Sequence, residues 1–252
     1  MGESVTGRVV RLLDCFSAAD PVLTVSQLAT RSGLHVATAS RLVAELERQG
    51  LVERTGDRGV RLGMRLWELG SRAQPTLLLR TLALPHLAWL QGIVGQNTQF
   101  GVRDGDEVLF LERVQAPGAV VNYTTVAGRL PLTASSSGLV LLAHADRATL
   151  ARVRAQVAPS YTPHTPTDPE HIRRLLAHVR REGYALCRGF LHADAAGLAA
   201  PVRDADGGVV AAVSVIVPND AGATRHVGVL LEAARRIDAS LTEHGFSHSA
   251  RT

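Results

Sequence analysis

The chain of 252 residues contains no lysine, so all 27 of its basic residues are arginines. Arginine side chains contact phosphates and can read guanine in the major groove of DNA, so this bias does not exclude a nucleic-acid ligand. The formal net charge of +4 is too small to indicate one by itself. Charge composition therefore leaves the class of protein open.

Aromatic residues are scarce at 4%, but 46% of the residues are hydrophobic, which excludes a disordered chain and leaves Leu, Val and Ala to fill the cores. The only cysteines, Cys15 and Cys187, lie far apart and form no CxxC motif. This spacing excludes a disulfide framework and gives no indication of a zinc site. The histidines form no compact ligand pattern either, so we expect no metal and no cofactor.

Long apolar runs are also missing, because no stretch of about 18 uncharged apolar residues occurs and the first residues lack the apolar core of a secretion signal. We therefore expect a cytoplasmic protein without a membrane partner. The length leaves room for a small module of about 60–80 residues beside a larger one, so two domains are expected.

The N-terminal sequence predicts three helices. Apolar residues at helical spacing indicate a first helix over Val9–Phe16. A second helix is capped by Thr24 or Ser26 and ends at Gly33, and a third covers Val36–Gln49. The tight turn between the second and third helices is typical of a helix-turn-helix.

The third helix carries the first candidate DNA contacts. In a helix-turn-helix, the N-terminal end of the second of the two helices enters the major groove. Thr38, Ser40 and Arg41 lie near that end. We predict that these three residues contact DNA, with Arg41 as the first choice.

A short hairpin follows. Residues 51–54 and 60–62 are typical of two strands joined by a polar turn, which together form a wing. Arg58 lies in the turn and is flanked by Arg54 and Arg61, where all three could contact phosphate or an adjacent minor groove. For each arginine taken singly, a solvated surface charge is an equal alternative.

The remaining sequence alternates between strand and helix patterns. Residues 64–94 have helical character interrupted by Pro75 and Pro85, which indicates a linker and a dimer-forming helix, with the domain boundary near Gln74. Behind it, period-two patterns and turn residues predict strands and period-3.6 patterns predict helices. The predicted strands are Thr98–Val102, Glu107–Val114, Val120–Val126, Leu198–Val202 and Val209–Val217, and the predicted helices are Pro169–Arg181 and Val227–Leu241.

Short blocks along nearly the whole chain resemble, in the same order, those of the IclR family of bacterial transcription regulators. In the N-terminal part they are 22–34 (VLTVSQLATRSGL), 40–46 (SRLVAEL), 50–54 (GLVER) and 61–63 (RLG). In the C-terminal part they are 104–108 (DGDEV), 128–132 (GRLPL), 181–184 (REGY), 199–204 (AAPVRD) and 213–215 (VSV). Each block is short, but their shared order over some two hundred residues makes coincidence improbable.

The resemblance implies an α+β architecture in three parts. A winged helix-turn-helix would occupy residues 1–63, a helical linker 64–80, and an effector-binding domain of the GAF/profilin-like type, with a curved antiparallel sheet, 81–248. It also implies a homodimer, paired into a dimer of dimers, that binds double-stranded operator DNA and responds to a small-molecule effector. Repression is the favoured mode of action.

The effector pocket can be placed through the same resemblance. In relatives, the segment after the GRLPL block turns into a helix N-terminus, whose free backbone donors suit a ligand carboxylate. Ser136 and Ser137 occupy these positions, with Leu130 as an apolar wall. Ser135 could equally be a plain helix cap.

The other pocket positions depart from the family pattern. Cys187 stands where an acidic residue is usual, Gly197 replaces a polar position, and Ile216 replaces one of two strand serines, which leaves Ser214 as the polar one. These changes predict a roomier, less polar cavity that favours an aromatic or longer apolar acid over a small keto acid. A packed, small apolar role is an equal alternative for Cys187.

Two other classes of function compete with this interpretation. A hydrolytic enzyme could be assembled from Ser137, His144, Asp146, His192 and Asp194, but the sequence has no nucleophile elbow, phosphate loop or HExxH motif, so we expect no catalytic residues. A ligand sensor that acts through protein contacts would use the N-terminal helices only as an interaction module. The basic wing argues against that alternative.

Overall fold

The computed structural model describes residues 3–17, 19–72, 74–120, 122 and 124–247. The chain divides into two compact units, Met1–Gln74 and Pro75–Thr252. The division falls inside the stretch 64–80 that was predicted to be a linker. Residues 64–74 of that stretch belong to the N-terminal unit, and residues 75–80 belong to the C-terminal unit. Each unit has a hydrophobic core of its own.

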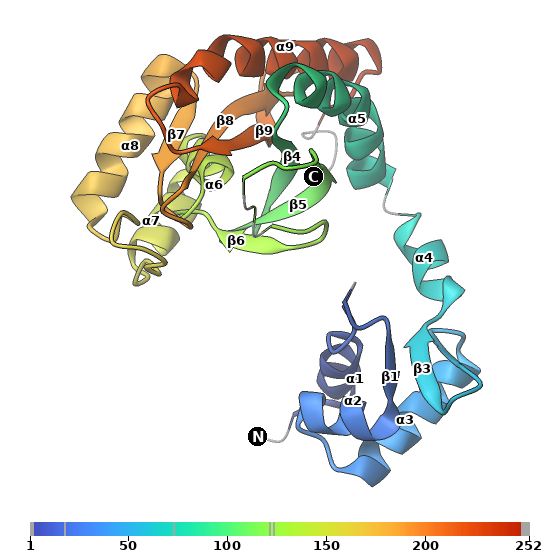
Figure 1. Ribbon diagram of the computed structural model, residues 1–252. Coiled ribbons are helices and arrows are strands. Elements are labelled where there is room, and N and C mark those ends of the chain that lie inside the picture. The colour runs from blue at the N-terminus through green and yellow to red at the C-terminus, as the bar shows by residue number, and fades with distance from the viewer. Residues whose placement is uncertain (1–2, 18, 73, 121, 123, 248–252) are drawn as a thin grey trace. The chain divides into compact units, whose positions relative to one another are not determined.

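The N-terminal unit combines four helices with a small antiparallel sheet in its described residues (Figure 1). In chain order the elements are α1 (Val5–Leu13), β1 (Val22–Thr24), α2 (Val25–Ser32), α3 (Val36–Arg48), β2 (Val52–Arg54), β3 (Gly59–Leu62) and α4 (Met64–Gly70). The strand order is β1-β3-β2, so the predicted hairpin gains β1 as a third strand. This added strand pairs Leu23 with Val60 and ties the wing to the start of α2.

Local capping explains where these helices begin and end. α1 starts at Val5, four residues earlier than predicted, because the Ser4 hydroxyl accepts the N–H of Gly7 at 3.0 Å. Thr24 caps α2 in a capping box with Gln27. Gly33 then adopts a left-handed φ of 65°, which closes α2 and turns the chain toward α3.

The helix-turn-helix is fixed by one apolar cluster. Leu12 of α1 and Leu28 of α2 are fully buried, and α3 contributes every third or fourth residue to the same core. The buried residues of α3 are Ala39, Leu42, Val43 and Leu46. This stripe sets the crossing of α2 and α3 and leaves the opposite face of α3 exposed.

The C-terminal unit is a six-stranded antiparallel sheet covered by helices on both faces (Figure 1). Its elements are α5 (Gln74–Val94), β4 (Asn97–Asp104), β5 (Glu107–Val114), β6 (Arg129–Pro131), α6 (Ser136–Ala143), α7 (Arg147–Arg154), α8 (Pro169–Glu182), β7 (Ala185–Arg188), β8 (Ala195–Arg203), β9 (Val209–Pro218), the 3-10 helix η1 (Ala223–His226) and α9 (Val227–Glu243). The strand order is β6-β5-β4-β9-β8-β7. The predicted α+β fold with an antiparallel sheet is confirmed.

Alternate residues of each strand enter the two cores. Leu198 and Ala200 of β8 pack with α5 and α9, whereas Ala199 faces α6 and α8 on the other side. α6 is buried along all eight of its residues, which makes it the central helix of its face. Its N-terminus therefore lies inside the domain, where a ligand would be screened from water.

Two sequence expectations differ from the structure. The predicted strand Val120–Val126 is not formed: residues 120, 122 and 124–126 have no strand structure, and Val121 and Tyr123 lie outside the described residues. Asn122 instead accepts the N–H of Thr124 through its side chain, which is a local turn that competes with strand pairing. β6 takes the place beside β5.

The predicted interruption at Pro85 is also wrong, because α5 runs through it. Leu79, Ala83, Leu87 and Leu90 bury one stripe of α5 in the core, and this packing outweighs the missing proline N–H. By length and composition, Pro75–Val94 is apolar enough to cross a membrane. One stripe of this helix packs in the core of the domain, and Arg80 on the helix forms an ion pair with Glu112 of β5 at 2.5 Å.

Candidate functional site

The first candidate surface is the exposed face of α3. Ser40 and Arg41 are exposed on it, and Thr38 is half-buried. The Arg41 guanidinium forms no hydrogen bond or ion pair with the rest of the described chain. The structure thus places the three predicted residues on one helix end, with Arg41 available to an outside partner.

Arg41 lies in a groove between α1 and α3 with two arginines that the sequence analysis missed. Arg8 of α1 and Arg48 of α3 line the same groove. Arg48 is paired with Glu45, whereas the Nε atom of Arg8 is buried without a hydrogen-bond partner in the described residues. Three guanidinium groups around one groove favour an anion such as a DNA phosphate. Arg8 was missed because it lies on a helix outside the helix-turn-helix pair.

The three wing arginines have different surroundings. Arg54 is paired with Glu47 of α3 at 2.9 Å, and Arg61 donates two hydrogen bonds to Glu53 across the hairpin at 3.0 and 2.8 Å. The bond from Arg61 lowers the pKa of Glu53, which also accepts the N–H of Met64. Arg54 and Arg61 therefore hold the wing together, in addition to any contact they make with DNA.

Arg58, at the wing tip, is exposed and has no partner in the described part of the chain. Its backbone has a left-handed φ of 58°, a conformation that non-glycine residues rarely adopt. Local strain of this kind occurs most often where function requires a particular residue. Of the wing arginines, Arg58 is the one whose charge is free to meet phosphate.

The second candidate site is a cavity on the α6 face of the large sheet. Each of the six strands contributes a wall residue: Leu130 (β6), Phe110 (β5), Gln99 (β4), Ile216 (β9), Gly197 (β8) and Cys187 (β7). The N-terminus of α6 and two loops complete the lining with Asn122, Thr124, Ala134, Ser135, Ser136, Ser137, Phe190, Leu191 and His192, and β8 adds Ala195. The wall is mostly apolar, with polar groups gathered in a few places, as is usual for small-molecule sites.

The α6 N-terminus supplies backbone donors to this cavity. The Ser135 hydroxyl caps the helix by accepting the N–H of Gly138 at 3.0 Å, so Ser135 is a helix cap that also lines the cavity. In the described structure the N–H groups of Ser136 and Ser137 have no acceptor. Two unpaired donors at the positive end of a buried helix favour an anion, and a carboxylate is a fitting group.

Gly197 brings the sheet close to α6. Cys187, Gly197 and Ile216 lie side by side across β7, β8 and β9, in paired register. A Cβ on Gly197 would come within 2.8 Å of the Ser136 hydroxyl, so only glycine fits here without displacing the Ser136 side chain. Burial raises the pKa of the Cys187 thiol, which therefore stays neutral and acts as a small apolar wall.

The seventh predicted residue, Ser214, does not line the cavity. It is fully buried on β9, and its hydroxyl donates to Gln99 Oε1 at 3.4 Å. Gln99 in turn donates to the Thr124 hydroxyl, which donates to Asn122 Oδ1 at 2.8 Å. The sequence analysis missed Gln99, Thr124 and Asn122, although the polar run 97–99 directly before the apolar Phe100 was a usable signal for Gln99.

The candidate hydrolytic residues are not assembled as a triad. Ser137 and His192 line the same cavity, but no hydrogen bond joins Ser137 to His192 or His144 within the described residues. His144 contacts the carbonyl of Val140 at 2.9 Å, and Asp146 caps α7. Among the described residues, no group of three or more His, Cys, Asp and Glu side chains could hold a metal ion.

A winged helix-turn-helix and a second domain with a cavity suited to a small molecule define a transcription regulator that senses a small molecule. Comparison with known proteins gives the family. The model of the IclR helix-turn-helix domain matches residues 5–56, and that of the bacterial transcriptional regulator IclR C-terminal domain matches residues 74–239. The chain belongs to the IclR family of bacterial transcriptional regulators.

Individual relatives agree with this assignment. The HTH-type transcriptional regulator XynR of Escherichia coli is 30% identical over 210 residues, which are 82% of this chain and 83% of XynR. Among solved structures, an IclR homologue from Microbacterium hydrocarbonoxydans complexed with 4-hydroxybenzoate is 44% identical, has a TM-score of 0.89 and covers 95% of this chain and 100% of its own. The IclR transcriptional regulator of Alicyclobacillus acidocaldarius is 27% identical, with a TM-score of 0.79 and coverage of 95% and 99%.

Proposed function

We propose that this protein is a repressor whose affinity for operator DNA changes when an aromatic carboxylic acid binds in the cavity on the α6 face. The observation that carries the proposal is the pair of unpaired N–H groups of Ser136 and Ser137 above an apolar wall. Such a site binds the carboxylate at one end and an apolar ring beyond it. The 4-hydroxybenzoate bound to the 44% identical homologue supports the same chemical class.

The departures from the family pattern favour a ring over a small keto acid. Gly197 adds no side chain to the wall beside Ser136, while Cys187 and Ile216 present apolar surface where polar groups are usual. Phe110 and Phe190 add flat apolar surface to the same wall. A two- or three-carbon acid would leave most of this surface uncovered, so its affinity would be lower.

DNA contact is assigned to Thr38, Ser40 and Arg41 on α3 and to Arg54, Arg58 and Arg61 on the wing. Arg41 and Arg58 are the strongest members of this set, because their guanidinium groups have no partner in the described chain. Arg8 joins them through the groove that it shares with Arg41. The operator is in the cytoplasm, and the protein acts there.

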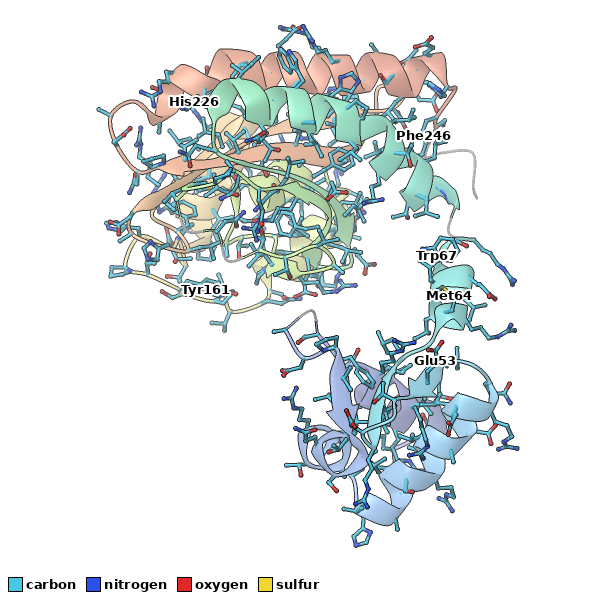
Figure 2. The ribbon with its side chains drawn as sticks, turned by 45° about the vertical axis from the view of Figure 1, so that its right-hand side comes forward. Glu53, Met64, Trp67, Tyr161, His226 and Phe246 are labelled. Atoms are coloured by element: carbon cyan, nitrogen blue, oxygen red, sulfur yellow. The ribbon has the colours of Figure 1, made fainter. Side chains whose placement is uncertain are left out.

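A homodimer, paired into a dimer of dimers, is the proposed assembly. α4 has no buried residue, and Met64 and Trp67 are 65% and 70% exposed on it (Figure 2). An exposed apolar helix of this kind is an association surface, and a two-fold dimer would present two α3 helices to a palindromic operator. Trp67→Ser should weaken dimer formation in analytical ultracentrifugation.

The test is a mobility-shift titration of the purified protein against DNA from upstream of its own gene, at several salt concentrations. A specific, salt-sensitive complex that changes with benzoate-type acids supports the proposal. Arg41→Ala should weaken the complex more than tenfold. Arg174→Ala, which removes an exposed arginine from α8, is the charge-matched control and should leave it unchanged.

Failure to bind any DNA, even after selection from genomic fragments, would contradict the regulator and favour a sensor that acts through protein contacts. Specific DNA binding without any response to aromatic acids would contradict only the effector. An effector must bind the two DNA-binding states with different affinity to act at all, so the ligand-induced shift is a direct readout.

A further inference from the structure

We infer that Asn122, held by a hydrogen-bonded chain from Ser214, recognises an oxygen acceptor on the effector's ring, away from its carboxylate. The inference rests on the proposed aromatic-acid effector and names a second polar end of the same cavity. This hydrogen-bonded chain consists of Ser214, Gln99, Thr124 and Asn122. The last three of these residues line the cavity.

The orientation of the Asn122 amide is fixed by a backbone group. The N–H of Thr124 lies 3.1 Å from the Asn122 side chain. Because a backbone N–H can only donate, the atom that it contacts must be the carbonyl oxygen, Oδ1. The Nδ2 group therefore occupies the other position, and the usual ambiguity of an asparagine amide does not apply.

The orientation of the Asn122 amide fixes the direction of the other hydrogen bonds in this series. The Thr124 hydroxyl donates its single proton to Asn122 Oδ1 at 2.8 Å, so it must accept its other bond, from Gln99 Nε2. The remaining Gln99 atom facing β9 is then Oε1, which accepts the Ser214 hydroxyl at 3.4 Å. Every group in the chain points the same way, and the chain ends in the Asn122 Nδ2 donors.

Those terminal donors are unpaired within the part of the chain that the structure describes. Nδ2 of Asn122 is buried and makes no hydrogen bond in the described residues. A buried donor without an acceptor is unfavourable by about as much as a lost hydrogen bond. Asn122 lines the cavity, so a ligand oxygen that reaches this amide would satisfy the donor, whereas an apolar ligand group would leave it unpaired.

The two polar ends of the cavity are attached to different strands of the sheet. The carboxylate site lies where Ser136 approaches Gly197 on β8, and the Asn122 chain is attached to the sheet at Gln99 on β4. β8 and β4 are separated by β9, so the two attachment points are about 10 Å apart at the usual strand spacing. Phe110 and Ile216 line the same cavity as apolar wall.

These constraints name the class of effector: a benzoate-type acid with a hydroxyl, or another oxygen acceptor, at the ring position opposite the carboxylate. A methyl group in that position fills the space without accepting a hydrogen bond. An amino group conjugated to the ring donates but accepts poorly. The site should therefore discriminate between substituents of nearly equal size.

The experiment is isothermal titration of the full-length protein with benzoate, 4-hydroxybenzoate, 4-methylbenzoate and 4-aminobenzoate. Wild type should bind 4-hydroxybenzoate about tenfold more tightly than the methyl and amino analogues, as one well-formed hydrogen bond predicts. Asn122→Leu, which has similar volume and no amide, should bind the hydroxyl and methyl analogues equally. Thr125→Ala changes an exposed neighbour of the chain and should keep the wild-type preference.

The outcomes separate the two proposals. If none of the four acids binds, the proposed effector class fails and this inference fails with it. If the acids bind wild type without preference for the hydroxyl, the effector class stands and the role of Asn122 is overturned, whether or not Asn122→Leu folds. A preference that survives unchanged in a folded Asn122→Leu variant also overturns it.

Discussion

The hydroxyl of Ser136 and the backbone of Gly197 are so close that a Cβ on Gly197 would lie 2.8 Å from Ser136 Oγ. A helix N-terminus and the middle of a strand meet at this point with no room for a methyl group. The contact sets the width of the cavity where the carboxylate is proposed to bind.

Gly197→Ala should therefore lower the free energy of unfolding by about 1–3 kcal/mol, as overpacking does, and weaken binding of aromatic acids. Replacement of Ser136 by alanine removes the clashing hydroxyl, and the remaining Ser136 Cβ would be at an ordinary 3.5 Å. The double variant should regain most of the lost stability. Urea denaturation of the four proteins measures this coupling, and strictly additive effects would show that the contact is not the cause.

The strained wing tip predicts opposite effects on folding and on DNA binding. Arg58→Gly should raise the free energy of unfolding by about 0.5 kcal/mol, because relief of the left-handed backbone exceeds the added entropy of the unfolded chain. Operator affinity should fall, and the salt dependence of binding should drop by about one phosphate contact per wing. Unchanged affinity and salt slope would mean that the wing tip does not touch DNA.

Three half-buried histidines predict a loss of stability in mild acid. Burial, with the charges of Arg203 and Arg180, lowers the pKa of His144 from its ordinary value of 6.5, and burial also lowers those of His86 and His226. The unfolded chain then binds more protons below pH 6.5, so stability is full above that pH and is lost as the pH falls through the folded-state pKa values. Thermal melts from pH 7.5 to 5 measure this slope.

His144→Gln should make the slope shallower, with the part due to His86 and His226 retained. A variant slope equal to that of wild type would show that His144 does not titrate differently in the two states.

Substitution of Ser214 should lower the stability of the fold, and it should have little effect on ligand affinity because Ser214 does not line the cavity. Ser214→Ala removes the donor to Gln99 Oε1 and should cost about 1 kcal/mol, at the low end for a buried group because the bond is long at 3.4 Å. Binding of unsubstituted benzoate should change by less than about twofold. A much larger loss would place Ser214 in the cavity wall, as the sequence suggested.

Local patterns predicted the helix-turn-helix because each of its parts is encoded by neighbouring residues. The apolar stripe of α3, the capping residue Thr24 and the left-handed Gly33 all act within a few residues of their own position. The strand β1 was not predicted, since its three residues become a strand only by pairing with β3, which follows much later in the chain. Pairing of this kind leaves little trace in a local pattern.

The cavity was predicted in part, through the family resemblance. Six of the seven proposed positions line it, because register in the sheet carries Cys187, Gly197 and Ile216 to one face. Asn122 and Thr124 were assigned to a strand that is not formed, and so were not considered as ligand contacts. Ser214 lies on the same face of β9 as Ile216, but its hydroxyl is bonded to Gln99 of the neighbouring strand β4. A contact of this kind joins residues far apart in the sequence and cannot be predicted from a local pattern.

The cavity wall takes at least one residue from each of the six strands, while the hydrogen bonds of the sheet and the core on its α5 and α9 face are made by other atoms. A substitution at any one of these positions changes the shape seen by a ligand without altering strand pairing. Such a wall can therefore be altered one residue at a time, and each intermediate can remain folded and bind DNA. The fold thus gives natural selection a short mutational path from one inducer to another.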